Sequence, residues 1–187
     1  AVDWLKTYVD AEKISDLVLV GHSLGSAIAL QYAIEHADDL KGMVLIGGGA
    51  RLRVHPDTLS FLARAIDKPD IFPQMFADSW QQVPADFSSD LRAEALSVGP
   101  AVYLNDMKSC DEFDVIARLT EISTPTLAIT GTEDVMTPPK YAEFLRDRMD
   151  HCETVFIEGG THFVFGEFPD PVNELIQQFL DKIDPNL

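Results

Sequence analysis

The sequence has few cysteines, few basic residues and no long apolar run. Its 187 residues include two cysteines, Cys110 and Cys152, which do not make a disulfide framework. We therefore expect free thiols and a cytoplasmic location. The 14 Lys and Arg against 31 Asp and Glu give a net charge of −17, which argues against nucleic acid or an anionic membrane as partner. No apolar run approaches the roughly 20 residues of a membrane span.

Short apolar runs alternate with segments of helical periodicity. Strands are predicted at residues 16–20, 43–46, 126–130 and 154–158, and helices at residues 1–14, 26–36, 138–149 and 171–183. Alternation of this kind builds a parallel sheet covered by helices. The fold class is therefore α/β.

The middle of the chain has a different pattern, with no buried strand. It contains short helical pieces near residues 57–66, 70–80, 86–98 and 111–121. We interpret residues 51–121 as a helical cap inserted into a core formed by residues 1–50 and 122–187. Its large apolar side chains are expected to be partly core and partly the lining of an apolar substrate pocket. They are Phe61, Phe72, Met75, Phe76, Trp80, Phe87, Tyr103 and Met107.

A tight turn joins the first strand to the helix that follows it. The turn reads Gly21-His22-Ser23-Leu24-Gly25, with glycine at both ends of a five-residue link. Such a turn needs glycine where a Cβ would clash, and it holds the central serine in a strained, exposed position. Ser23 is therefore a candidate nucleophile.

A serine nucleophile needs a base and an acid that orients the base. Asp134 follows the third predicted strand and His162 follows the fourth, so both should lie at the same sheet edge as Ser23. The order Ser, Asp, His is the one expected for a nucleophile elbow. Glu133 is the competing acid, and we favour Asp134 because aspartate is the shorter and commoner partner.

The other histidines do not fit the role of base. His22 adjoins Ser23 on an extended segment, so its side chain should point to the opposite face. His36 ends a helix that leads away from the site, His55 belongs to the insertion, and His151 precedes its strand. The second strand ends in three glycines at residues 47–49, which we interpret as a flexible exit into the cap.

These residues together resemble the α/β-hydrolase superfamily. The matching segments are GHSLG at residues 21–25, LAITGTEDVMTPP around Asp134, LKGMVLIGGGARL at residues 40–52 and IEGGTHFVFGEFPDPVNELIQQFL around His162. The resemblance implies strands five to eight of that fold, with Ser23 as nucleophile, His162 as general acid/base and Asp134 as orienting acid. It also implies that the backbone N–H of Leu24 is an oxyanion-hole donor.

The resemblance departs from the family at the front of the chain. Strands one to four are absent, and so is the loop that supplies the second oxyanion N–H. We expect the first strand to be an open apolar edge, completed by self-association or by a missing N-terminal segment. Losing one oxyanion donor costs roughly 10²–10³ in turnover, so activity of this chain alone should be impaired.

A serine at the turn favours hydrolysis of a small, hydrophobic carboxylic ester or thioester through an acyl-enzyme. Three alternatives stay open: a C–C bond hydrolase or lyase with the same triad, a non-catalytic small-molecule receptor or interaction module, and a fragment whose role is structural. The five histidines show no metal-ligand spacing, and the glycine-rich loops match no phosphate-binding motif. No cofactor and no metal are expected.

Overall fold

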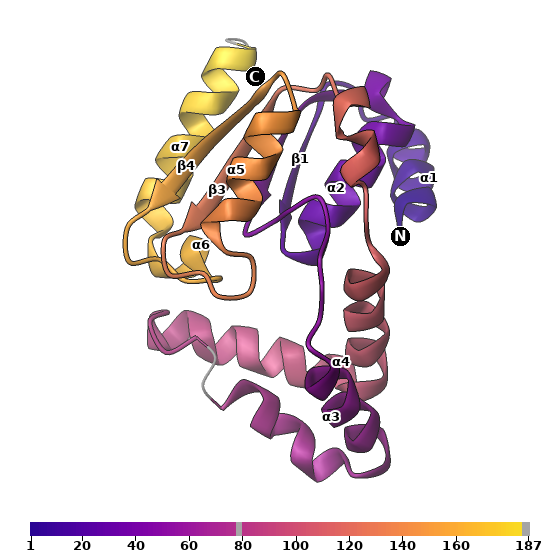
Figure 1. Cartoon of the computed structure of the whole chain (residues 1–187), viewed down its shortest axis with the longest axis vertical. Helices are drawn as coiled ribbons and strands as arrows, with labels where there is room; N and C mark the ends of the chain where they lie inside the picture. Colours follow the sequence, from indigo (N-terminus) through magenta and orange to yellow (C-terminus); the bar gives the residue numbers. More distant parts are fainter. Residues whose placement is uncertain (78–79, 185–187) are drawn as a thin grey trace. The chain divides into compact units, whose positions relative to one another are not determined.

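The computed structural model describes residues 1–77 and 80–184. The chain divides into two compact units. The first comprises Ala1–Arg51 and Asp114–Leu187, and the second comprises Leu52–Phe113. Figure 1 shows the course of the chain through both units.

The first unit contains a parallel sheet in the order β1-β2-β3-β4. The strands, within the described residues, are β1 (Leu17–His22), β2 (Leu40–Ile46), β3 (Thr126–Gly131) and β4 (Cys152–Ile157). The predicted α/β class and parallel sheet are confirmed. β2 begins three residues earlier than predicted, at Leu40, because its first residues pair with the start of β1 at Leu17.

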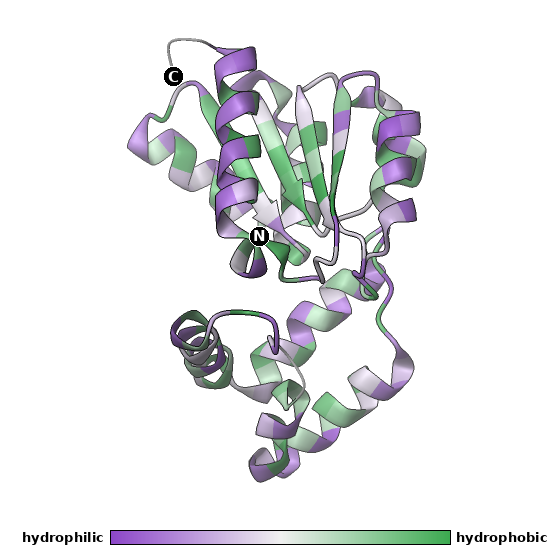
Figure 2. Cartoon of the chain, turned by 90° about the vertical axis from the view of Figure 1, so that its left-hand side faces the viewer, coloured by the Kyte–Doolittle hydropathy of each residue, from purple (hydrophilic) through white to green (hydrophobic). Residues whose placement is uncertain are grey.

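Helices cover both faces of this sheet. Contacts with β1 and β2 come from α2 (Leu24–Glu35), and contacts with β3 and β4 come from α5 (Pro139–Arg148). α7 (Pro169–Ile183) covers the opposite face, where a Cβ at Gly42 would lie 3.2 Å from the Phe179 ring. The sheet thus lies between these two layers, and the hydropathy colouring marks its strands as apolar (Figures 1 and 2).

One apolar core of the first unit lies between the sheet and α7. Side chains point to α7 from alternate strand positions, as strand geometry requires. The buried members are Val44, Ile46, Leu127, Ile129, Ile157, Val164, Val172 and Phe179. Val164 belongs to the short helix α6 (Val164–Glu167), so the segment that follows β4 is anchored in this core.

β1 lies at the edge of the sheet, as predicted. Among the described residues it pairs only with β2, and Val20 is 55% exposed. The preceding helix α1 (Val2–Glu12) buries Val9 but leaves the stacked rings of Trp4 and Tyr8 exposed. In the described part of the chain, the outer edge of β1 is therefore unpaired, and at least one of its apolar side chains, Val20, is open to solvent.

The second unit contains α3 (Pro56–Asp67), the 3-10 helix η2 (Pro69–Phe76) and α4 (Ala85–Glu112). The helix predicted at 86–98 does not end there, because α4 continues beyond a break at Gly99, whose φ is 79°. Pro100 then starts a new run of helix, a position where its fixed φ and missing N–H are tolerated. The helical piece predicted near 111–121 is shorter than expected: α4 ends at Glu112, and the 3-10 helix η3 (Ile116–Glu121) follows.

Aromatic side chains build the core of the second unit. The rings of Phe72, Phe76 and Tyr103 pack edge-to-face at centroid distances of 5.3–5.8 Å, and Phe76 stacks on Trp80 at 5.3 Å. Phe72, Phe76 and Trp80 are buried, whereas Phe87 is exposed. Much of the apolar content predicted for this segment is therefore its own core.

The two chain segments that connect the units pair with each other inside the first unit. Arg51 and Asp114 form an antiparallel β-bridge, and their side chains approach to 3.5 Å. Next to them, the Val115 N–H donates to the Ala50 carbonyl at 2.8 Å. The segment that leaves the first unit therefore lies beside the segment that returns to it.

The core predicts a specific loss of stability. Ile129→Ala, at a fully buried site, should lower the free energy of unfolding by about 2–5 kcal/mol, because it removes buried methyl groups and leaves a cavity. Chemical denaturation monitored by circular dichroism measures this. Ile14→Ala, at a site that is 38% exposed in the same unit, is the matched control and should cost less than half as much. Equal losses would contradict the assigned core.

Candidate active site

Ser23 occupies a strained turn at the end of β1. Its φ of 52° and ψ of −115° are unusual for a residue with a side chain. Its N–H donates to the Ile46 carbonyl at 3.0 Å, and its own carbonyl accepts the N–H of Ser26 at 2.9 Å at the start of α2. The backbone on both sides of Ser23 is therefore fixed, which maintains the strained conformation.

Of the two glycines in this turn, only Gly21 is required by steric contact with its surroundings. A Cβ at Gly21 would lie 2.3 Å from the Gly25 carbonyl oxygen, a distance that no side chain tolerates. A Cβ at Gly25 would meet nothing within 4 Å. The prediction that both glycines avoid a clash is therefore correct for Gly21 and wrong for Gly25.

Asp134 and His162 form a buried hydrogen-bonded pair. Asp134 lies in the loop after β3 and His162 in the loop after β4, and both are buried. The Nδ1 atom of His162 lies 2.9 Å from Oδ2 of Asp134. Adjacent parallel strands bring these loops together, since their carboxyl ends share one edge of the sheet.

Hydrogen bonds satisfy the Asp134 carboxylate on both oxygens. Oδ1 accepts the N–H groups of Met136 and Thr137, and Oδ2 accepts the Thr137 hydroxyl, all at 2.8 Å. Burial alone would raise the pKa of Asp134, but the hydrogen bonds from His162 and Thr137, with the charge of His162, outweigh it and hold that pKa below its ordinary value. Asp134 is therefore ionised at neutral pH.

The pair determines which nitrogen of His162 is free. An ionised carboxylate only accepts hydrogen bonds, so His162 carries its proton on Nδ1 and presents Nε2 as an acceptor. Nε2 is buried and has no hydrogen-bond partner among the described residues, Ser23 included. A buried unpaired acceptor is uncommon and calls for an explanation such as a catalytic role.

Glu133 and the glycines after β2 take different places. Glu133, the competing acid, is exposed, and its N–H donates to the Gly160 carbonyl at 2.9 Å. Gly47 has a φ of 54°, and a Cβ there would lie 3.1 Å from His162 Nδ1. The expectation of a flexible exit at residues 47–49 is therefore wrong for Gly47, because this glycine lets the backbone approach the buried pair.

His22 lies against His162, which the sequence did not predict. Its Nε2 lies 2.8 Å from the His162 carbonyl oxygen, and the two rings are 4.7 Å apart. Strand alternation predicted the opposite face, but β1 ends here and Ser23 departs from extended geometry. Burial and the nearby His162 lower the pKa of His22 from its ordinary 6.5 to about 4.

The remaining histidines lie elsewhere, in agreement with their exclusion. His36 follows α2 and contacts the ring of Tyr32. His55 lies in the second unit, where it accepts the Asp57 N–H at the start of α3. His151 is exposed before β4. In the described residues, no group of three or more His, Cys, Asp or Glu side chains could hold a metal ion.

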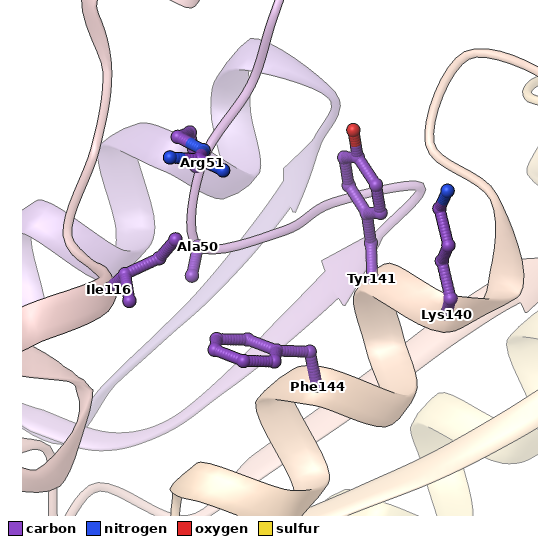
Figure 3. Close-up of a pocket in the computed structure, with 6 residues that line it drawn as sticks. All are labelled: Ala50, Arg51, Ile116, Lys140, Tyr141 and Phe144. Carbon is purple, nitrogen blue, oxygen red and sulfur yellow. The ribbon is translucent and has the colours of Figure 1, made fainter.

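A pocket of about 260 Å³ lies in the first unit, apart from Ser23, Asp134 and His162. Figure 3 shows Ala50 and Arg51 on the chain after β2, with Tyr141 and Phe144 on α5. Ile116 and Lys140 complete its lining. The lining is mostly apolar and includes two basic residues, Arg51 and Lys140.

The family of the chain follows from its sequence as well as from this fold. Residues 1–175 match the family described as "Alpha/beta hydrolase family". The chain belongs to the α/β-hydrolase family, a family that includes many enzymes. No helix among residues 1–77 and 80–184 is long and apolar enough to cross a membrane.

Individual relatives carry hydrolase and esterase names. A Pseudomonas savastanoi pv. phaseolicola protein named RutD, proposed to hydrolyse carbamates, is 25% identical, with 95% of this chain and 72% of the relative aligned. The pimeloyl-[acyl-carrier protein] methyl ester esterase of Yersinia enterocolitica is 22% identical over 88% of this chain and 69% of its own length. The solved structure of a thermophilic esterase is 31% identical, with a TM-score of 0.82 over 98% of this chain and 74% of that one.

The shifted pKa of His22 predicts a pH-dependent stability. Because the pKa is about 4 in the folded state and 6.5 when unfolded, the unfolded chain binds a proton more readily between these values. The unfolding free energy should therefore fall as the pH is lowered from about 6.5 to about 4. His22→Phe should remove this part of the slope. Urea denaturation of both proteins across that range measures it, and identical slopes would contradict the shift.

Proposed function

We propose that the chain is a serine hydrolase in which Ser23, His162 and Asp134 form a catalytic triad. The observation that carries this proposal is the buried Asp134–His162 hydrogen bond, which leaves Nε2 of His162 as an unpartnered acceptor. Ser23 adds support, since it occupies the strained turn at the same edge of the sheet. The hydrolase and esterase names of relatives agree with this chemistry.

The proposed reaction proceeds in two steps. Oγ of Ser23 attacks the ester carbonyl while Nε2 of His162 takes the serine proton, and Asp134 stabilises the resulting imidazolium. His162 then gives this proton to the leaving alkoxide or thiolate. In the second step a water attacks the acyl-enzyme with His162 again as base, which releases the acid and restores Ser23.

The negative charge on the carbonyl oxygen needs donors. The Leu24 N–H begins α2, where the first N–H groups of a helix have no partner within the helix. We propose it as one oxyanion donor, aided by the positive end of the α2 dipole. With one assigned donor, we expect slow turnover of esters by this chain.

We propose a small, hydrophobic carboxylic ester or thioester as substrate. The esterase names of relatives favour an ester. We further propose that residues 51–121 act as a cap whose apolar side chains contribute to substrate binding. We propose a cytoplasmic location, because the two cysteines, Cys110 and Cys152, are free and do not make a disulfide framework.

The triad predicts covalent labelling at one serine. A fluorophosphonate probe should label the wild-type chain on Ser23, and Ser23→Ala should abolish labelling, as read by peptide mass spectrometry. Asp134→Asn should slow it by up to about 10⁴-fold, because the amide favours the wrong tautomer of His162. Glu133→Gln, the neighbouring exposed acid, is the matched control and should label normally.

The labelling experiment, together with turnover assays on short-chain esters and a vinylogous diketone, separates the alternatives. Folded wild-type chain that fails to label would contradict the triad and favour a non-catalytic receptor or interaction module. Labelling at Ser23 with turnover of a vinylogous diketone, but not of short-chain esters, would contradict ester hydrolysis and favour a C–C bond hydrolase. Labelling with ester turnover supports the proposal.

The open edge of β1 predicts self-association. We propose that a second copy of the chain pairs with this edge, because its strand is apolar and Val20 is 55% exposed. Light scattering should show a mass that rises with concentration, and Val20→Lys should reduce the rise. Val102→Lys, at a position 51% exposed on α4, is the matched control. A monomer at all concentrations would contradict this proposal.

A further inference from the structure

His22 connects the strand that carries Ser23 to the backbone of His162. It is the last residue of β1, and its Nε2 lies 2.8 Å from the His162 carbonyl oxygen. Its ring also lies 4.8 Å from Phe165 and 5.6 Å from Phe163. Two aromatic rings from the residues that follow His162 therefore pack against the His22 side chain.

The direction of this hydrogen bond is fixed by its acceptor. A backbone carbonyl can only accept, so His22 carries its proton on Nε2 and donates it to His162. His22 is half-buried among rings, which disfavours its charged form. The side chain therefore acts as a neutral donor with one fixed tautomer.

Asp134 and Glu167 also anchor the segment that carries His162. Asp134 fixes Nδ1 of the His162 ring. One residue earlier, the Thr161 N–H donates to Glu167 Oε2 at 2.7 Å, and the Thr161 hydroxyl donates to the other oxygen of Glu167. These anchors tie the loop to β3 and to α6. Of these three anchors, only the His22 hydrogen bond ties it to β1.

We propose that His22 is a positioning residue that sets His162 relative to Ser23. This inference rests on the proposed triad. Ser23 and His162 come from opposite ends of the sheet order, directly after β1 and after β4. The hydrogen bond from His22 to the His162 carbonyl connects the two sides of the site directly. The distance between Ser23 and His162 therefore does not depend only on the positions of the two strands between them. A base held in one position raises the rate by fixing the reacting atoms.

Three substitutions separate the hydrogen bond from the packing of the ring. His22→Gln places an amide N–H near the position of Nε2 and keeps a donor. His22→Asn is polar but too short to reach the His162 carbonyl. His22→Phe keeps a ring and removes the donor. The hydrogen-bond model requires His22→Gln to behave like the wild type and both His22→Asn and His22→Phe to be impaired.

The first measurement is the second-order rate of fluorophosphonate labelling at Ser23. His22→Phe and His22→Asn should slow labelling roughly tenfold, the effect of about one lost hydrogen bond, while His22→Gln should label within about threefold of the wild-type rate. If an ester is turned over, the loss should appear in kcat rather than KM. His36→Phe, another half-buried histidine that contacts a ring, is the matched control and should label at the wild-type rate.

The second measurement does not depend on activity. The Nδ1 proton of His162, held by Asp134, should give a low-field proton NMR signal. Exchange of this proton with water should be several-fold faster in His22→Asn and His22→Phe than in the wild type and His22→Gln. Thermal unfolding of each variant shows which are folded. If His22→Phe does not fold, the comparison of His22→Asn with His22→Gln tests the proposal.

The outcomes distinguish the two proposals. If the wild type is labelled at Ser23 and the labelling rates of His22→Asn and His22→Phe are unchanged, the role of His22 is overturned and the triad stands. Impairment of all three variants would overturn it too, because packing of the imidazole would then be what matters. Absence of wild-type labelling would overturn the triad, and the exchange of the Nδ1 proton would still decide whether His22 anchors the loop.

Discussion

The hydrogen bond between Asp134 and His162 is the interaction on which the site depends. A buried carboxylate is tolerated only when its oxygens are satisfied, and Asp134 meets this condition with partners from its own loop and from His162. The arrangement requires the loops after β3 and β4 to lie side by side, which parallel pairing of these strands provides. It also requires a small residue at Gly47, where a side chain would press on the imidazole.

Much of the fold could be predicted because hydrophobic periodicity follows directly from burial. Four short apolar runs indicated the strands, and their alternation with helices indicated parallel pairing. The same reasoning placed Asp134 and His162 at one edge of the sheet, where the structure brings them within 2.9 Å. Distances of this kind follow from topology, since loops at the carboxyl ends of adjacent parallel strands are neighbours.

Other features could not be predicted because they depend on local backbone geometry. The face to which His22 points cannot be extrapolated from strand alternation once the next residue has a φ of 52°. The continuation of α4 beyond Gly99 depends on Pro100, which can end one helix or begin another. The aromatic residues of the second unit give no sequence signal that distinguishes a core from a substrate pocket, and Phe72 and Phe76 lie in the core.

The bridge between Arg51 and Asp114 has a consequence for variation within this fold. Because the outgoing and returning segments are paired inside the first unit, the residues between them form a closed loop whose ends are already held together. The entropic cost of closing such a loop grows only slowly with its length. The intervening helices can therefore be lengthened, shortened or exchanged without disturbing the pairing of the strands in the sheet.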